Sequence, residues 1–449
     1  MMAVRKRQNI GCISIVGLGK LGLCMAACFA QKYKVEAVDV DRNKIELIRQ
    51  GKNPVQEPGL TEALNNYRKN LCVSSDYQKA VVNSQVTFIV VATPSEVDGS
   101  FSNGQLEESL QNIGLALREK DEYHLVVITS TVMPGTTDHI GKAILEKTSG
   151  KICGKDFGLA YNPEFIALGS VIHDFLNPDF TLIGEANKQD GEILENIYRN
   201  ICENSPRFAR MNPVNAEIAK ISLNCYVTMK ITFANSLAAI CERVSGADAE
   251  IITRAIGLDS RIGGKYLKPG LGFGGPCFPR DNVAFATFAR GVNVEAKLAG
   301  IVDEVNREQG KRIVNIVEEL GAKIKKTKER IVIGVLGLSY KPNTPIIEDS
   351  QAIDIVRSLI DKGYKVIVYD PQALELAKNV FGDGVIHAKN GVECVKEADV
   401  VLVATPWDEF KSIDMTGTKK DLCILDCWGI IKDRGLGVPI KYIGKGVGV

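Results

Sequence analysis

The sequence lacks a charge imbalance and has few histidines. Its 55 lysines and arginines are balanced by 54 aspartates and glutamates, which leaves a net charge of +1, and its four histidines are scattered. A nearly neutral chain has no broad positive field to attract nucleic acid or an anionic membrane. We therefore expect no nucleic-acid partner and no metal ion, and any anionic ligand must be held by a few cations placed close to it.

Paired cysteines and long apolar runs are also missing. The twelve cysteines of the 449-residue chain include no Cys-x-x-Cys pair, which is typical of reduced thiols. No run reaches the ~18 uninterrupted apolar residues of a membrane span. Arg5, Lys6 and Arg7 precede an apolar stretch as in a secretory signal, but Lys20 and three glycines interrupt that stretch. These observations predict a cytoplasmic protein without a membrane partner.

A nucleotide-binding pattern opens the chain. A β-branched run precedes Gly17, Gly19 and Gly22, and a helical stretch then leads to a second strand that ends at Asp39. The first glycine permits a tight turn, the second lets backbone approach a pyrophosphate, and the third allows close helix packing. The helix start offers free N–H groups to the anion. The Asp39 carboxylate would accept hydrogen bonds from the ribose hydroxyls. It would also repel the 2′-phosphate of NADP, so the predicted cofactor is NAD.

The chain repeats an α/β pattern. An apolar run ends in Ala-Thr-Pro at 92–94, and another ends in the same three residues at 404–406, although the second half lacks the glycine pattern and is expected to hold a different ligand. Between the halves, Pro213 begins a long helical stretch that could carry a dimer interface. The predicted fold is α/β, with two Rossmann-like doubly wound domains joined by a central helical domain that has a long helix. Three domains are predicted: an NAD-binding domain over 1–210, a central helical and dimerisation domain over 211–312, and a nucleotide-sugar-binding domain over 313–449.

The segment from Gly270 to Asp281 has the composition of a reactive loop. Four glycines within a few residues of Cys277 make a poor core segment, because glycine costs backbone entropy and contributes no packing. They suit a loop that approaches a ligand and exposes the sulfur. The other eleven cysteines are expected to pack as small apolar residues.

Four more residues are candidates for chemistry. Lys220 and Asn224 lie four apart and share a helix face, although a solvated lysine is the commoner outcome at such a spacing. Glu164 lies among apolar and turn residues, where partial shielding would raise its pKa and allow it to act as a base. Thr131 follows an apolar strand and either lines a ligand crevice or caps a turn.

Seven motifs follow one another along the chain: Gly17 through Gly22, Glu57-Pro58-Gly59-Leu60, Ser130-Thr131-Val132, Asn162-Pro163-Glu164-Phe165, Lys220 with Asn224, Gly272 through Asp281, and Gly337 through Pro342. In this order they resemble the motifs of the UDP-glucose/GDP-mannose dehydrogenase family, the nucleotide-sugar dehydrogenases, along essentially the whole chain.

The resemblance implies an oxidoreductase that converts the C6 alcohol of a nucleotide sugar to a uronic acid with two NAD and one water. Cys277 would attack the intermediate aldehyde, and the resulting thiohemiacetal would be oxidised to a thioester that water hydrolyses. Glu164 would be the base in hydrolysis, and Thr131 would position water.

The resemblance also implies that Lys220 and Asn224 stabilise oxyanions at C6 and hold the catalytic water, and that Asp281 hydrogen-bonds that water and Lys220. In the family, the residue that matches Arg261 can reach across from a partner subunit, which implies a homodimer or a larger assembly.

The implied cofactor-binding residues are Gly17, Gly19, Lys20, Leu21, Gly22, Asp39, Thr93, Pro94 and Thr131. The implied substrate-binding residues are Glu164, Phe165, Lys220, Asn224, Arg261, Tyr266, Leu267, Phe273, Gly274 and Lys341.

The sequence departs from the family pattern at four places. The family often has lysine at the position of Arg280, an acid at Leu168 and arginine at Phe180. An arginine usually precedes Glu-Ser in the C-terminal motif, and the segment Ile347-Glu348 has none. These departures weaken the inference to any one sugar. The Gly-Gly-Pro-Cys-Phe-Pro loop is closer to the UDP-glucose and GDP-mannose branches than to the N-acetylhexosamine branch. The predicted substrate is a UDP-hexose, with UDP-glucose first, and a UDP-N-acetylhexosamine or GDP-mannose is the alternative.

Two other function classes stay open from the sequence. A β-hydroxyacid dehydrogenase shares the Rossmann domain and following helices, but it performs one oxidation and needs neither the Cys277 loop nor a second α/β domain. An inactive nucleotide-sugar-binding protein would not need the predicted catalytic residues together.

Overall fold

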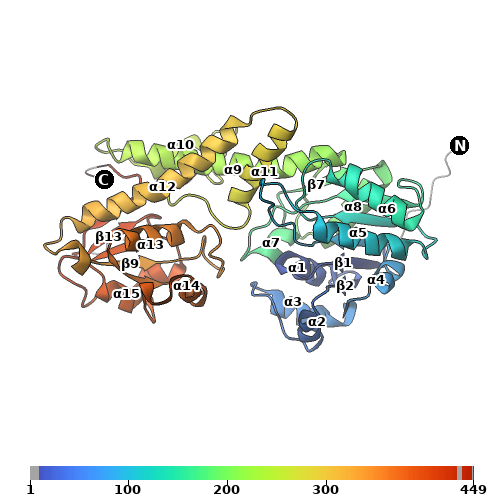
Figure 1. Ribbon diagram of the computed structural model, residues 1–449, viewed down its shortest axis with the longest axis horizontal. Coiled ribbons are helices and arrows are strands. Elements are labelled where there is room, and N and C mark those ends of the chain that lie inside the picture. Colours follow the sequence, from blue (N-terminus) through green and yellow to red (C-terminus); the bar gives the residue numbers. More distant parts are fainter. Residues whose placement is uncertain (1–9, 432–436, 447, 449) are drawn as a thin grey trace. The chain divides into compact units, whose positions relative to one another are not determined.

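The computed structural model describes residues 10–431, 437–446 and 448, so that Arg5, Lys6 and Arg7 lie outside the described residues. The chain forms two compact units whose boundary falls between Ser222 and Leu223. This boundary lies inside the long helix α9 (Pro213–Cys241). In Figure 1 the first unit runs from blue to green and the second from green to red.

The first unit is built on an eight-stranded sheet with the order β3-β2-β1-β4-β5-β6-β7-β8. All its strand pairs are parallel except β6 with β7. Its strands are β1 (Cys12–Val16), β2 (Lys34–Val38), β3 (Leu71–Ser74), β4 (Val86–Ile89), β5 (His124–Ile128), β6 (Phe157–Tyr161), β7 (Phe180–Glu185) and β8 (Arg207–Met211). Its helices are α1 (Lys20–Phe29), α2 (Arg42–Arg49), α3 (Leu60–Tyr67), α4 (Tyr77–Asn83), α5 (Gly104–Leu117), α6 (Lys142–Ser149), α7 (Val171–Leu176) and α8 (Lys188–Ile201).

Both faces of this sheet are buried. Successive residues of a strand point to opposite faces, and here both sets are apolar: Ile15 and Phe88 pack in a core with α1 and α8, whereas Val16 and Ile89 pack in a core with α5. A parallel sheet covered on both faces needs such continuous apolar strands.

The second unit contains a six-stranded parallel sheet with the order β11-β10-β9-β12-β13-β14. Its strands are β9 (Val332–Leu336), β10 (Lys365–Tyr369), β11 (Ile386–His387), β12 (Val400–Val403), β13 (Cys423–Asp426) and β14 (Ile440–Tyr442). Its helices are α10 (Ala249–Ile256), α11 (Phe278–Gly291), α12 (Lys297–Gly321), α13 (Gln351–Asp361), α14 (Leu374–Phe381) and α15 (Gly391–Glu397). Two parallel-sheet α/β folds with a helical segment between them confirm the predicted fold class.

The internal repeat extends to hydrogen bonds. In the first unit the backbone N–H of Leu18 donates to the Asp39 carboxylate at 2.7 Å, and in the second the N–H of Leu338 donates to Asp370 at 2.7 Å. In both units, therefore, an acid that follows the second strand binds the turn after the first strand. Within the described residues, no helix combines the length and apolar character needed to cross a bilayer.

Candidate active site

The glycine turn after β1 is shaped by close backbone contacts. Gly17 has φ +95°, and a Cβ there would lie 2.5 Å from the carbonyl oxygen of Val90. A Cβ on Gly22 would lie 1.9 Å from the carbonyl oxygen of Gly17. By contrast, a Cβ on Gly19 would have no atom within 4 Å, so the backbone of this residue is open to a ligand.

Asp39 lies at the end of β2, beside this turn. Its carboxylate is 7% exposed and accepts hydrogen bonds from Leu18 N, Asp41 N and the Lys44 ammonium, the last at 2.8 Å. Burial opposes ionisation, but the hydrogen bonds from Lys44 and the backbone outweigh it and keep the pKa of Asp39 below its ordinary value. A carboxylate has about four acceptor positions, so these three donors leave one for a ribose hydroxyl.

The loops after β4 and β5 are joined at the same edge of the sheet. The Thr93 hydroxyl donates to the Thr131 carbonyl at 2.7 Å, and the Ser130 hydroxyl donates to the Val91 carbonyl at 2.6 Å. β1 and β4 are neighbours at the point where the strand order reverses, which is the position at which doubly wound sheets bind dinucleotides. The open Gly19 backbone and the Asp39 carboxylate therefore fit NAD, with Lys20 and Leu21 in the first turn of α1.

Glu164 follows β6 and is partly buried. Its Oε1 lies 2.5 Å from the hydroxyl of Tyr198, a residue of α8 that is 1% exposed. The Lys220 ammonium, from α9, donates to the backbone carbonyl of Glu164 at 2.8 Å. Burial raises the pKa of Glu164 to about 7, against the opposing effects of Tyr198 and Lys220. The carboxyl can therefore exchange a proton near neutrality.

Phe165 lies between a cation and a second ring. The Lys220 ammonium is 4.6 Å from the centre of the Phe165 ring, and the Phe180 ring is 4.9 Å away with its plane tilted by 34°. Phe180, where the family often has arginine, thus forms an aromatic pair. Leu168, at another departure, packs against the core of the first unit.

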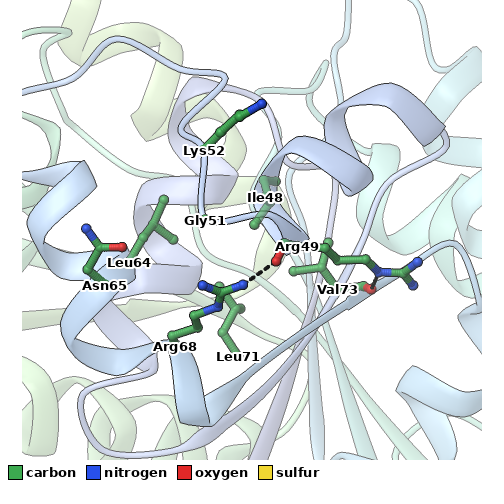
Figure 2. A pocket seen from close by; sticks show the side chains of 9 residues that line it. All are labelled: Ile48, Arg49, Gly51, Lys52, Leu64, Asn65, Arg68, Leu71 and Val73. Carbon is green, nitrogen blue, oxygen red and sulfur yellow. Dashed lines mark hydrogen bonds between the residues drawn. The ribbon is translucent and has the colours of Figure 1, made fainter.

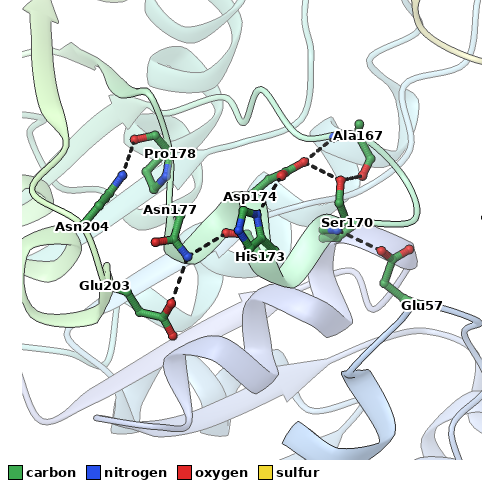
Figure 3. Close-up of polar contacts among 10 residues, drawn as sticks. Glu57, Ala167, Ser170, His173, Asp174, Asn177, Pro178, Glu203 and Asn204 are labelled. Atoms are coloured by element: carbon green, nitrogen blue, oxygen red, sulfur yellow. Dashed lines mark hydrogen bonds and ion pairs between the residues drawn. The ribbon is translucent and has the colours of Figure 1, made fainter.

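The loop that carries these residues is fixed by Glu57. Its carboxylate accepts hydrogen bonds from the backbone of Gly169 and Val171, at 2.9 and 2.8 Å, at the start of α7. Figure 3 shows this contact beside the hydrogen bonds that join Ser170, Asp174 and Ala167. The loop is therefore held by Glu57 and by hydrogen bonds between its own residues and α7.

A second group of predicted residues lies in the second unit, around the start of α11. Cys277 is the N-cap residue of this helix and is exposed. One turn later, Asp281 is 1% exposed, and its Oδ2 accepts a hydrogen bond of 2.6 Å from the Asn224 amide of α9. Arg280 lies 3.7 Å from the other oxygen of Asp281. The thiol is thus exposed next to a buried amide–carboxylate pair.

Amide side chains hold the glycine-rich loop in place. Asn235 accepts from Gly270 N, Asn306 accepts from Phe273 N, and Gln351 accepts from Gly272 N, all at 2.8 to 2.9 Å. Gln309 and Asn306 also donate to loop carbonyls. These hydrogen bonds pair the backbone of residues 270–273, at the start of the segment that leads to Cys277.

The predicted substrate residues differ in their placement. Tyr266 and Phe273 both contact the ring of Phe278, the residue after Cys277, with ring centres 6.2 and 6.4 Å apart. Arg261 does not join this ring cluster, because its guanidinium is 87% exposed and pairs with Asp259 at 2.6 Å.

Three more predicted substrate residues lie in the second unit. Leu267 is buried. Gly274 packs closely on the backbone of Asp349, where a Cβ would lie 2.2 Å from the carbonyl oxygen. The Lys341 ammonium lies 5.9 Å from the ring centre of Tyr340.

The expectation that every cysteine except Cys277 packs in the interior is wrong for Cys72. Its side chain is exposed because β3 is an edge strand of the first sheet, where alternate residues face solvent. Burial, followed by the nearby Glu36 carboxylate, raises the pKa of the Cys72 thiol. Cys24, Cys28, Cys241, Cys394 and Cys427 are buried as predicted.

One cavity lies away from the predicted residues, and another lies beside the glycine-rich loop. One of about 170 Å3 lies among α2, α3 and β3, where Arg68 donates to the Arg49 carbonyl; it contains none of the predicted residues (Figure 2). The other, of about 310 Å3, is lined by Phe273, Arg307 and Lys311 together with residues of α13. Its lining also includes Asp303, Asp349 and Asp354, and Arg307 pairs with Asp303 at 2.7 Å, so this cavity carries charges of both signs.

Known proteins match this chain throughout. Three models of the UDP-glucose/GDP-mannose dehydrogenase family match it: the NAD binding domain over 11–202, the central domain over 214–308 and the UDP binding domain over 334–433. The chain belongs to this family. It is therefore an NAD-dependent nucleotide-sugar dehydrogenase, as the sequence predicted.

Individual relatives agree with this assignment. The UDP-glucose 6-dehydrogenase AglM of Haloferax volcanii is 37% identical over 90% of this chain and 93% of its own. The GDP-mannose 6-dehydrogenase of Pseudomonas aeruginosa is 37% identical over 80% of each chain. A solved UDP-glucose dehydrogenase from Pyrobaculum islandicum has a TM-score of 0.87 and 31% identity, covering 98% of this chain and 99% of its own.

The glycine turn makes a paired prediction. Gly22→Ala should lower the melting temperature by an amount equivalent to about 1–3 kcal/mol, because its methyl group meets backbone. Gly19→Ala should leave the melting temperature unchanged but weaken NAD binding, because its methyl group enters the space where the pyrophosphate must approach. Calorimetry and NAD titration measure the two effects. Equal melting temperatures for the two variants would contradict this division of roles.

Proposed function

We propose that the enzyme oxidises the C6 alcohol of a UDP-hexose, with UDP-glucose as the first choice, to the uronic acid through a thioester on Cys277. The observation that carries this proposal is an exposed thiol at the start of α11 with the Asn224–Asp281 pair one turn away. A single oxidation would need no nucleophile of this kind. NAD, when bound, supplies the hydride acceptor for both oxidations.

Cys277 acts between the two oxidations. Its thiolate adds to the C6 aldehyde, and the thiohemiacetal that forms retains a hydrogen on C6 that can leave as hydride, which gives a thioester. Water then adds to the carbonyl carbon, the C–S bond breaks, and the acid and the free thiol are released. Covalent capture also prevents escape of the aldehyde.

The remaining residues divide between charge stabilisation and proton transfer. Lys220, an ammonium that is 8% exposed, and the Asn224 amide are donors for the oxyanion at C6. Glu164 removes a proton from the attacking water, and since its pKa is about 7, the ionised fraction rises as the pH rises through neutrality. Thr131 and Asp281 bind that water.

Two observations favour UDP-glucose or GDP-mannose over a UDP-N-acetylhexosamine, and UDP-glucose comes first because two of the three proteins named above carry its name. The two relatives named above are named for UDP-glucose and GDP-mannose, and the solved structure is named for UDP-glucose. The Gly-Gly-Pro-Cys sequence fits the same branches. GDP-mannose is the second candidate.

A homodimer is part of the proposal. Tyr226, Phe233 and Ile240 lie seven residues apart on α9 and are 55%, 53% and 61% exposed. An exposed stripe of large apolar side chains on one helix face favours packing against a second copy of the chain. The exposed Arg261 is then available to the partner's substrate site. The twelve free thiols agree with the reducing conditions of the cytoplasm.

The reaction is tested by counting NADH for each nucleotide sugar in a panel of UDP-glucose, UDP-N-acetylhexosamines and GDP-mannose. We expect two NADH for each UDP-glucose and, for Cys277→Ala, less than a hundredth of the wild-type rate of acid formation. One NADH per substrate would contradict the proposal in favour of a single oxidation. No NADH with any sugar would favour an inactive binding protein.

The dimer is tested with Phe233→Glu. A charge in the middle of the stripe should reduce the mass measured by light scattering from twice 48.9 kDa to 48.9 kDa. Val97→Glu is the matched control, because Val97 is an exposed valine outside α9. Unchanged mass for Phe233→Glu would contradict the assignment of this stripe.

A further inference from the structure

We infer that Tyr198 and Asn162 are positioning residues that direct the proton of Glu164. This inference rests on the proposed function, in which Glu164 is the base of thioester hydrolysis. The Tyr198 hydroxyl lies 2.7 Å from Asn162 Oδ1 and 2.5 Å from Glu164 Oε1, so two acceptors share one hydroxyl group.

The orientation of Asn162 is fixed by its other contacts. The side chain is fully buried, and its Nδ2 donates to the Leu182 carbonyl at 2.8 Å, while its backbone N–H donates to the Ile128 carbonyl at 2.8 Å. Only the NH2 end of an amide can bind a carbonyl oxygen, so Oδ1 must face Tyr198. Tyr198 is equally immobile, because its ring packs 5.8 Å from the ring of Phe175 in the core.

Counting protons shows how the three groups are coupled. A phenol has one proton to donate. When Glu164 is neutral, its own O–H can donate to Tyr198, which in turn donates to Asn162. When Glu164 is ionised, the Tyr198 proton turns to the carboxylate, where the hydrogen bond is charge-assisted and stronger. Ionisation of Glu164 therefore turns the O–H of Tyr198 from Asn162 to Glu164, and the hydrogen bond between Tyr198 and Asn162 is lost.

The two residues consequently act in opposite directions on Glu164. The Tyr198 hydroxyl stabilises the ionised carboxylate, whereas the Asn162 oxygen competes for the same proton and so favours the neutral acid. A residue pair that merely filled space in the core would not produce effects of opposite sign.

Other ionisable groups near Glu164 come from three helices. Lys220 on α9 favours the ionised form. Cys28 on α1 and Cys202 at the end of α8 also face it, but burial raises the pKa of each thiol to about 12, so both stay neutral near pH 7. The state of Glu164 near neutrality is therefore governed by Lys220, Tyr198 and Asn162.

The test is a carbon-13 NMR titration of enzyme labelled at the glutamate carboxyl carbon, with the Glu164 signal identified by its loss in Glu164→Gln. We expect Tyr198→Phe to raise the Glu164 midpoint by about one pH unit and Asn162→Leu to lower it by about one unit. Asn162→Ala is a second variant that removes the same acceptor without added bulk. Tyr33→Phe is the matched control, because Tyr33 is a buried tyrosine of the same core whose hydroxyl binds Asn200 instead.

Opposite shifts in the two variants, with none in Tyr33→Phe, would support the inference. Absent shifts, or shifts of the same sign, would overturn it. The pH dependence of turnover should move with the NMR midpoint while KM for the sugar stays constant. If the midpoints shift but turnover does not follow, the Tyr198–Asn162 pair stands and the role of Glu164 as the hydrolytic base fails.

Discussion

Three buried polar side chains of helix α9 each need a hydrogen-bond partner, and the partners they find lie in the segments around the proposed site. Glu217, Lys220 and Asn224 lie on successive turns of α9 and are all nearly inaccessible to solvent. A buried charge or amide is costly unless it is hydrogen-bonded. Glu217 accepts from the backbone of Gly135 and Thr137, Lys220 donates to Glu164, and Asn224 donates to Asp281. These pairings hold the segments that follow β5 and β6 and the first turn of α11.

This constraint explains how a chain with little net charge handles a highly charged substrate. The structure places single charges beside particular partners, such as Lys44 beside Asp39 and Lys220 beside Phe165. In partly buried surroundings such charges act more strongly than they would in water. The Glu164 carboxyl shows the same principle, since burial, a tyrosine and a lysine together bring its pKa near 7.

Sequence periodicity and glycine spacing were sufficient for the fold class, the NAD turn and the shielded setting of Glu164. They could not reveal Tyr198, Lys44 or the amides that bind the glycine-rich loop. Tyr198 is 34 residues from Glu164, and Asn306 is 33 residues from Phe273, so no local spacing marks either contact. Cys72 was misjudged because a strand's place at a sheet edge depends on strand order, which local sequence does not contain.

The central claim is that carbon and sulfur become covalently joined during the reaction. Its most direct test is intact-mass analysis of Glu164→Gln enzyme mixed with UDP-glucose and excess NAD. Since loss of the base slows hydrolysis, the account predicts that a uronyl thioester accumulates on Cys277, located by peptide mapping, and that it is absent from the Glu164→Gln/Cys277→Ala double variant. Release of free aldehyde with no adduct on Cys277 would contradict the account.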